Sequence, residues 1–376
     1  MTDPSFETTS LLDEIRQWVE LESPTTDPDA VNRMVDKVEV DATVAGTRTI
    51  RTPGRDGFGD HLLVTSPWGS EEQRGILVLS HLDTVHDVGT LAKELPYRVE
   101  GNSVFGPGIY DMKGGAFAAF AALRKLVADG RNDLPPIRQL FVSDEEVGSH
   151  TSRAMIEAEA RRATHVLVTE PAREGGRIVT ARKGTARFDI TVTGRPAHSG
   201  ARHQDGRSAI RELARQILDL EAMTDYATGV TVNVGVIRGG TRANVVAEHA
   251  SAEIDMRVPN PEIGDAAIAC LMAIKPYDPD CTLEVTGGLN RPGYEKSPEI
   301  EALFQHARTL AAEIGFDLQD LKTGGGSDGN FTAAIAPTLD GLGLDGKGGH
   351  THEEQIYLSS IVPRTMLLMR LMETLK

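Results

Sequence analysis

Imidazole and carboxylate side chains stand in this sequence where short apolar runs end and where a glycine-rich turn opens a helix. Apolar runs of this length are typical of buried strands. In open α/β sheets, functional side chains gather at the carboxyl ends of the strands, so we expect these residues to share one crevice. The residues concerned are His81, Asp83, Asp111, Glu145, Glu146 and Glu170.

One histidine with several carboxylates suits zinc in an open site, because nitrogen and oxygen ligands leave a position for water or substrate. A late histidine could complete the set, and the pattern alone does not decide between His350 and His352. Each cluster is a weak signal by itself. Glu145-Glu146, for example, would also suit a helix N-terminus, where the macrodipole favours acids. Together, the four clusters make the metal-site hypothesis much stronger; they are His81 with Asp83, the turn with Asp111, Glu145 with Glu146, and Glu170.

The glycine-rich turn over residues 106–115 has a second interpretation as a phosphate-binding loop. It is a poor dinucleotide fingerprint, because Gly106 and Gly108 are followed by Asp111 where the third glycine would stand. A carboxylate there would also repel a pyrophosphate. We therefore favour the metal-site interpretation of this turn.

The elements that must position these residues follow an α/β order through the first half of the chain. Strand-like and helical stretches alternate, which predicts a mostly parallel sheet flanked by helices. The expected helices cover 11–22, 115–130 and 152–162, and the expected strands cover 76–79, 140–142 and 165–168.

After Lys183 the pattern changes to the βαββαβ order of a ferredoxin-like domain. The expected strands cover 186–193, 230–238, 250–258 and 282–286, with helices over 206–220 and 261–273 and a turn at Gly239-Gly240. We predict a catalytic domain in two parts, 1–182 and 289–376, with an inserted domain over 183–288.

Composition excludes several classes of partner. A formal net charge of −16 over 376 residues argues against a nucleic-acid partner, which requires a basic face. The two cysteines form no C-x-x-C pattern, so neither a thiolate metal site nor a disulfide framework is expected. The first residues lack a signal-peptide pattern, and Arg124 and Lys125 interrupt the most apolar helix. We expect a cytoplasmic protein with no membrane partner.

Taken together, the motifs resemble the zinc metallopeptidase family that contains glutamate carboxypeptidase, acetylornithine deacetylase, succinyl-diaminopimelate desuccinylase and aminoacylase. The resemblance runs from about His81 to the C-terminus and is closest to the glutamate carboxypeptidase branch. It implies two zinc ions per subunit, with Co²⁺ or Mn²⁺ as possible substitutes. It also implies that the inserted domain is a lid through which the chain forms a homodimer.

The resemblance assigns a role to each matching residue. Asp111 would bridge the two zincs, beside a cis peptide bond to Met112, and Glu145 would be the general base. Asp83 would orient the imidazole of His81. His350 is preferred to His352 because Glu354 follows it at the family's spacing. The implied ligands are His81, Asp111, Glu146, Glu170 and His350.

Substrate recognition is implied for two further groups. In the resembled family, the residue matching His198 stabilises the oxyanion in the partner subunit's site. Those matching Asn244 and Arg257 grip a substrate carboxylate, a contact that suits a guanidinium. The alternative for His198 is an ordinary loop histidine, and the alternative for Arg257 is a surface ion pair. For the glycine loop of the second group, named next, the alternative is a flexible turn. The second group comprises the loop residues Gly325, Gly326 and Ser327, with Lys183 at the domain junction.

Three functions follow as hypotheses. The first is a dinuclear zinc hydrolase that cleaves an amide next to a free carboxylate and releases a C-terminal amino acid, for which glutamate is the candidate. The second is an N-acyl amino acid deacylase that uses the same site. The third is a non-hydrolytic binding protein, against which Glu145 and the full ligand set argue. The expected substrate is a small peptide or an N-acyl amino acid.

Overall fold

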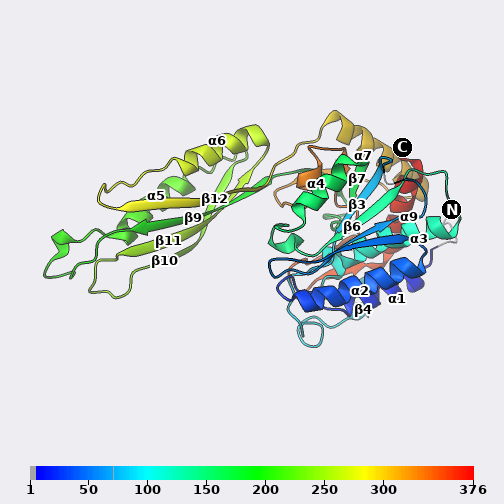
Figure 1. Ribbon diagram of the computed structural model, residues 1–376, viewed down its shortest axis with the longest axis horizontal. Coiled ribbons are helices and arrows are strands. Elements are labelled where there is room, and N and C mark those ends of the chain that lie inside the picture. Colours follow the sequence, from blue (N-terminus) through cyan, green and yellow to red (C-terminus); the bar gives the residue numbers. More distant parts are fainter. Residues whose placement is uncertain (1–5, 71) are drawn as a thin grey trace. The chain divides into compact units, whose positions relative to one another are not determined.

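The computed structural model describes residues 6–70 and 72–376 (Figure 1). The chain forms two compact units. The first comprises the described part of Met1–Thr180 with Lys296–Lys322 and Ser327–Lys376, and the second comprises Ala181–Glu295 with Thr323–Gly326. The second unit therefore lies within the sequence of the first.

A six-stranded sheet forms the centre of the first unit. Its order is β1 (Arg48–Thr52), β2 (His61–Thr65), β6 (Ile137–Val142), β3 (Gly75–His81), β7 (Ala163–Val168) and β14 (Thr338–Leu339). The four strands from β6 to β14 pair in parallel, and β1 and β2 add an antiparallel edge. All residues of β3 are buried, as its continuous apolar run predicts for a strand covered on both faces.

Helices cover both faces of this sheet. Alternate residues such as Leu140 and Val142 pack with Ile156 of α4 (Arg153–Arg161) in one cluster. Phe141 points the other way, where the Trp18 ring of α1 (Thr8–Val19) lies with its centroid 6.1 Å from that of Phe141. The remaining helices are α2 (Pro28–Val44), α3 (Gly114–Ala128), α7 (Pro298–Ile314), α8 (Gly329–Thr332) and α9 (Leu358–Thr374). The expected α/β fold with a mostly parallel sheet is confirmed.

Three helices begin with the same local chemistry. Asp27, Asn260 and Ser297 each precede a proline and accept a hydrogen bond from the backbone N–H three residues later. The side-chain oxygen satisfies an amide that the first turn leaves unpaired, and proline costs no hydrogen bond at that position. These caps explain where α2, α6 (Pro261–Met272) and α7 start.

Two smaller sheets complete the fold. β15 (Gly346–Lys347), β16 (Gln355–Tyr357), β5 (Ser103–Phe105) and β4 (Arg98–Glu100) form one of them, in that order. It brings the segment around residue 350 next to the turn that follows β5. β13 (Asp320–Thr323) and β8 (Ile178–Arg182) form the other.

The second unit is an antiparallel sheet with two helices. The strand order is β10 (Thr231–Gly239), β11 (His249–Val258), β9 (Gly184–Thr193) and β12 (Thr282–Arg291). Along β9, Phe188, Ile190 and Val192 are buried, and the residues between them are exposed. The buried side chains share one core with residues of α5 (Ala209–Glu221) and α6 (Pro261–Met272), so one face of the sheet is covered.

Some boundaries in the second unit differ from the predicted ones. The helix expected from residue 206 begins at Ala209, because Ser208 caps it by accepting from Arg211 N. The strand expected to end at residue 286 runs to Arg291. The sequence did not indicate this extension, because Gly287 and Gly288 interrupt the apolar alternation. The connection between β10 and β11 covers residues 240–248, and Gly240 at its start has a positive φ of 71°, whereas Gly239 belongs to β10. Val246 N bonds Ala197 O, and Ala247 O accepts from Ala209 N, which holds this loop in place.

Candidate active site

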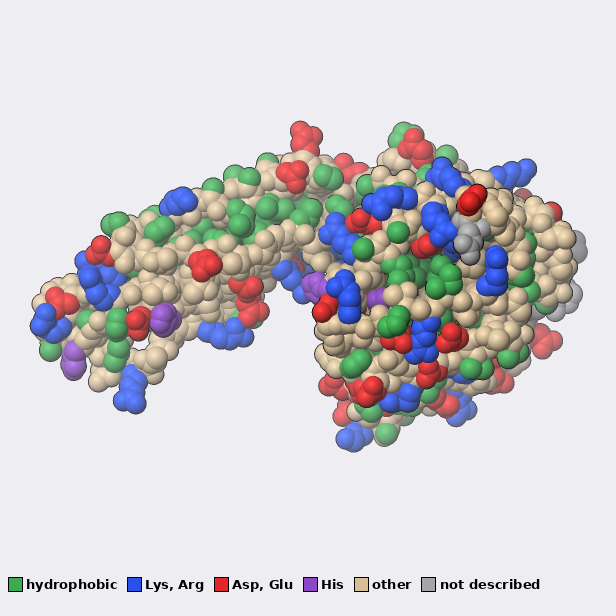
Figure 2. Space-filling model, viewed as in Figure 1, with side chains coloured by type: hydrophobic (Ala, Val, Ile, Leu, Met, Phe, Trp, Pro, Cys, Tyr) green, Lys and Arg blue, Asp and Glu red, His purple; other side chains and the backbone are tan. Residues whose placement is uncertain are grey.

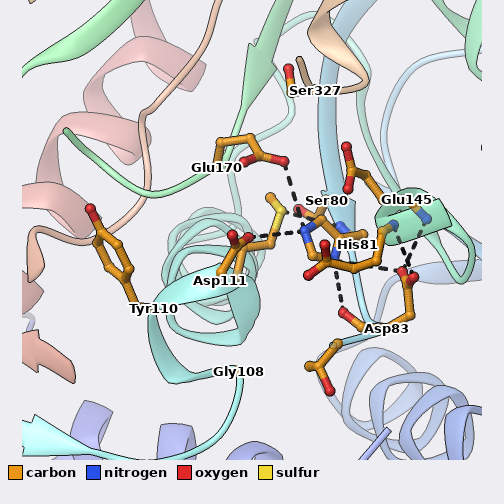
Figure 3. A network of polar contacts seen from close by, with 12 residues as sticks. Ser80, His81, Asp83, Gly108, Tyr110, Asp111, Glu145, Glu170 and Ser327 are labelled. Carbon is orange, nitrogen blue, oxygen red and sulfur yellow. Dashed lines mark hydrogen bonds and ion pairs between the residues drawn. The ribbon is translucent and has the colours of Figure 1, made fainter. Parts of the chain in front are cut away.

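The predicted strand-end residues meet at one edge of the sheet of the first unit. His81 is the last residue of β3, and Glu170 follows β7. Glu145 and Glu146 lie in a short helical turn, Glu145–Val147, that follows β6. Because β3, β6 and β7 run in parallel, their carboxyl ends lie together. Asp111 joins them from the helical turn Ile109–Lys113 that precedes α3 (Figure 3).

Asp111 lies between two imidazoles and faces each with one oxygen. His81 Nε2 is 3.2 Å from Asp111 Oδ1, and His350 Nε2 is 3.2 Å from Asp111 Oδ2. Two further carboxylates lie on either side: Glu170 Oε1 is 3.7 Å from His81 Nε2, and Glu146 Oε2 is 3.2 Å from His350 Nε2. The arrangement is that of two adjacent donor sets sharing one carboxylate.

These residues fit a divalent cation. The potential ligand atoms of His81, Asp111 and Glu146, and those of His81, Glu145 and Glu170, each lie within 4.8 Å of one another. Glu146 Oε1 is buried and has no hydrogen-bond partner among the described residues. A buried carboxylate oxygen without a donor calls for a cation or water beside it.

The electrostatics of the cluster also favour a bound cation. Burial raises the pKa of Glu146 to about 8, and the nearby charge of Asp111 adds to the shift, against the opposing contact of His350. Burial also lowers the pKa of His81, but Asp111, Asp83 and Glu145 outweigh it and hold that pKa well above its usual value. Carboxylates packed this closely ionise together only beside compensating positive charge. A bound metal ion would supply that charge.

Asp83 organises both the imidazole of His81 and the turn that carries Glu145 and Glu146. His81 Nδ1 lies 2.9 Å from the Asp83 carbonyl oxygen and 3.6 Å from Asp83 Oδ1. The Asp83 carboxylate accepts hydrogen bonds from Glu145 N and Glu146 N, both at 3.2 Å, and from Thr25 Oγ1 at 2.7 Å. The carbonyl therefore orients the ring, and the carboxylate fixes the two glutamates. The second role had no signal in the sequence.

Glu354 is a further site residue whose role sequence reasoning missed. Its buried carboxylate accepts from the backbone N–H groups of Gly108 (3.2 Å), Tyr110 (2.9 Å) and Asp111 (3.0 Å). Its Oε2 also lies 2.6 Å from His86 Nε2. One carboxylate thus anchors the turn that carries Asp111. The Asp111–Met112 peptide bond in this turn is cis.

The structure distinguishes the two late histidines by position. His350 has a positive φ of 63° and directs its ring at Asp111 and Glu146, with about half of its side chain exposed (53%). His352 is exposed, and its ring centroid lies 6.4 Å from that of His86. His350 is therefore the one that the structure brings to the carboxylates.

In the second unit, His198 and Asn244 belong to neighbouring loop segments. Asn244 O accepts from Ser199 N at 3.1 Å. His198 is exposed, and its Nδ1 accepts from Gly200 N and Ala201 N, both at 3.1 Å. Because Nδ1 accepts, the neutral ring carries its proton on Nε2, which faces away from those amides.

The other predicted substrate residues have protein partners. The Arg257 guanidinium pairs with Asp255, with distances of 2.6 Å from Nε and 2.9 Å from Nη2. Lys183 N donates to Thr323 O at 3.0 Å, and the buried Arg182 donates to the carbonyl oxygens of Gly325 (3.2 Å) and Gly326 (3.3 Å).

Ser327 belongs to the first unit and is fully buried. Its hydroxyl donates to Asp340 Oδ2 at 2.5 Å and accepts from Gly329 N at 3.0 Å. The hydroxyl is therefore engaged inside the protein.

Comparison with known proteins identifies the family of this chain. Residues 77–374 match the family described as Peptidase family M20/M25/M40. The chain belongs to this family. Carboxypeptidase G2 from Pseudomonas sp. (strain RS-16) is 32% identical over 300 residues, which is 78% of this chain and 72% of that protein. Succinyl-diaminopimelate desuccinylase from Cupriavidus taiwanensis is 27% identical over 275 residues, 69% of this chain and 70% of that protein.

A solved structure shows the same fold over nearly the whole chain. An aminopeptidase from Bacillus cereus ATCC 10987 superposes with a TM-score of 0.79 at 22% identity, covering 98% of this chain and 99% of that one. As an M20 family member with carboxypeptidase relatives, the protein is a metal-dependent hydrolase. Among the described helices, none combines the length and apolar character that a bilayer crossing needs.

Proposed function

We propose that this protein is a dinuclear zinc carboxypeptidase that releases a C-terminal amino acid, with glutamate as the first candidate. The observation that carries the proposal is the position of Asp111, whose two oxygens face His81 and His350 at 3.2 Å each. A carboxylate shared by two imidazoles in this way suits a bridge between two ions. One ion would be held by His81, Asp111 and Glu170, and the other by His350, Asp111 and Glu146.

Bound zinc would supply Lewis-acid activation of water and of the scissile carbonyl. The residues of the chain supply the proton transfers. Glu145 lies on the other side of the His81 ring from Asp111 (Figure 3), and its backbone is held by Asp83. From this position its carboxylate would take a proton from the attacking water and deliver it to the leaving amine. Glu146, its neighbour, is left free to act as a ligand.

The second unit would bind the substrate as an inserted lid and dimerisation domain over residues 183–288. With Nδ1 held by two backbone amides, His198 would present Nε2–H as a donor to the developing oxyanion in the partner subunit's site. Arg257 and Asn244 would hold the substrate carboxylate, and the loop of Gly325, Gly326 and Ser327 would offer backbone amides. Lys183 is a further candidate. Because the Ser327 hydroxyl bonds Asp340, its part would be to support the loop.

A homodimer through the second unit is supported by helix α6. Its sequence is apolar almost all round, yet only Gly264 and Leu271 are buried. Met272 is 43% exposed and Cys270 is exposed, and Figure 2 shows hydrophobic side chains gathered over α6 and β12. Helices that are apolar on every side are normally covered. A second copy is the proposed cover, and light scattering after gel filtration should give twice the monomer mass of 40.5 kDa.

An N-acyl amino acid deacylase remains the second candidate, because the desuccinylase match covers a similar share of the chain. The higher identity to the carboxypeptidase and the glycine loop favour the first. Membership of a peptidase family favours both over a non-hydrolytic binding protein.

The experiment combines metal analysis with Glu145→Gln. We expect two zinc ions per subunit in both proteins, and a fall in kcat of about 10²–10⁴-fold in the variant, the usual contribution of a general base. A panel of dipeptides and N-acyl amino acids would separate the two candidates. Full activity of Glu145→Gln would remove the assigned base, and a single bound ion would remove the dinuclear site.

A further inference from the structure

Directly after Glu170 the chain forms a short hairpin, residues 173–177. Arg173 N donates to Arg177 O at 2.8 Å, and Arg177 N donates to Arg173 O at 3.1 Å. Gly175 and Gly176 turn the chain with φ angles of 75° and 74°, a conformation that L side chains rarely adopt. The hairpin is thus a defined structure beside one of the proposed metal ligands.

Contacts from the rest of the first unit hold this hairpin in place. The buried Arg364 of α9 donates to Gly176 O at its tip. At its base, Ala172 N donates to Leu344 O at 3.1 Å, and the Tyr110 hydroxyl donates to Ala172 O. Tyr110 lies beyond Asp111 when viewed from His81 (Figure 3). The hairpin therefore keeps a fixed position next to the carboxylate cluster.

The Arg173 guanidinium points toward the cluster without a hydrogen bond to hold it. Its Nη2 is 3.9 Å from Glu170 Oε2, beyond hydrogen-bond distance, and its Nε is buried with no partner among the described residues. Its side chain is 31% exposed, so part of the group reaches solvent. A guanidinium has five N–H donors, and leaving a buried one unpaired is unfavourable.

Lys113 is another cation close to the cluster, but its ammonium group is already engaged inside the protein. Its side chain is buried, and its Nζ donates to Leu21 O at 2.6 Å. Glu170 in turn lies 3.7 Å from His81 Nε2, so Arg173 is separated from the centre of the cluster by a single carboxylate.

We propose that Arg173 is a specificity residue that receives a carboxylate on the substrate side chain next to the cleaved amide. A planar guanidinium with free donors makes paired, charge-assisted contacts to a carboxylate. Because the hairpin fixes the backbone of Arg173, the side chain would meet that group from a set position. The inference rests on the proposed function and assigns a residue to the expected preference for an acidic side chain at the cleavage point.

A purely structural role predicts something different. If Arg173 only balances the charge of Glu170, its removal would weaken metal binding and would slow every substrate alike. If it selects substrate, the metal stays and the loss depends on the charge of the substrate. The pair to compare is an N-acyl glutamate and the matching N-acyl glutamine, which have nearly the same shape and differ in charge.

The experiment uses zinc-loaded wild type, Arg173→Gln and Arg173→Lys, with Arg161→Gln as the control. Arg161 is an exposed arginine whose contact is the ion pair with Glu157 on the same helix. We expect Arg173→Gln to lower kcat/KM for the glutamate substrate about tenfold or more, mainly through KM, and to change the glutamine substrate less than about threefold. Arg173→Lys should lie between, and metal content should not change.

Equal losses on both substrates, no loss on either, or loss of zinc from Arg173→Gln would each overturn the inference. So would wild-type enzyme that shows no preference for the acidic substrate, or that cleaves other amides but not this pair. Wild type that cleaves no amide in the panel would refute the proposed function, and the inference with it.

Discussion

Replacement of Glu354 by glutamine should destabilise the turn that carries Asp111. The Glu354 side chain is buried and accepts from three backbone N–H groups, Gly108 on Oε2 and Tyr110 and Asp111 on Oε1. Its Oε2 also contacts His86 Nε2. Glutamine keeps the shape of the side chain but turns one acceptor oxygen into an NH₂ group.

The size of the effect follows from these contacts. The NH₂ group is best placed toward His86, since that imidazole can change its tautomer and accept, whereas the backbone amides cannot. Gly108 N–H then faces another donor and stays unpaired, which costs about 1–3 kcal/mol. The bonds to Tyr110 and Asp111 lose their charge assistance, and the combined loss of unfolding free energy should be about 2–4 kcal/mol.

Urea denaturation with and without zinc would measure this loss, and a competing chelator would measure the change in zinc affinity. Glu353→Gln is the matched control, because the neighbouring Glu353 is exposed. We expect a lower midpoint and weaker zinc binding for Glu354→Gln alone. A Glu354→Gln protein within about 0.5 kcal/mol of wild type, the scatter of ordinary surface substitutions, with unchanged zinc affinity, would refute the reasoning.

Two other predictions concern buried polar groups. Burial lowers the pKa of His61 below its ordinary 6.5, against the opposing charges of Asp144 and Asp60. The folded state therefore binds this proton less readily than the unfolded chain, so stability is kept above the unfolded pKa and lost as pH falls through the lowered folded-state pKa. Urea denaturation between about pH 8 and about pH 5 should show that the unfolding free energy falls less steeply with pH in His61→Asn than in wild type. Equal slopes for the two proteins would contradict the assigned pKa shift of His61. Ser327→Ala should lower the unfolding free energy by about 1–3 kcal/mol, because it removes one buried hydrogen bond to Asp340 and one from Gly329 N. If its main effect is instead a higher KM with unchanged stability, then the hydroxyl contacts substrate directly.

The sheet of the first unit was predictable because its signals are local. The apolar run 76–79 and the polar residues after it are adjacent in the sequence, so both the strand and the position of His81 at its end could be inferred. The same holds for the runs before Glu145 and Glu170. Strand limits were less accurate where glycine replaces the apolar alternation, as at Gly287 in β12.

The contacts between distant segments could not be predicted in the same way. Glu354 bonds amides about 245 positions earlier, and nothing near residue 354 indicates that partner. The Asp83 carboxylate bonds the amides of Glu145 and Glu146, a contact set by the pairing of β3 with β6 rather than by residue type. The free donors of Arg173 depend on a hairpin that the sequence presents only as two glycines.

The anchoring of the 108–111 turn by Glu354 has a consequence for biosynthesis. A nascent chain that has left the ribosome as far as residue 320 contains all the candidate ligands except His350, but its turn lacks the carboxylate that organises it. Strand β14 and helix α9 are also missing at that stage. The anchored form of the turn therefore requires that the segment with His350 and Glu354 has been made, and a product truncated before that segment would lack both a candidate ligand and the carboxylate that holds the turn.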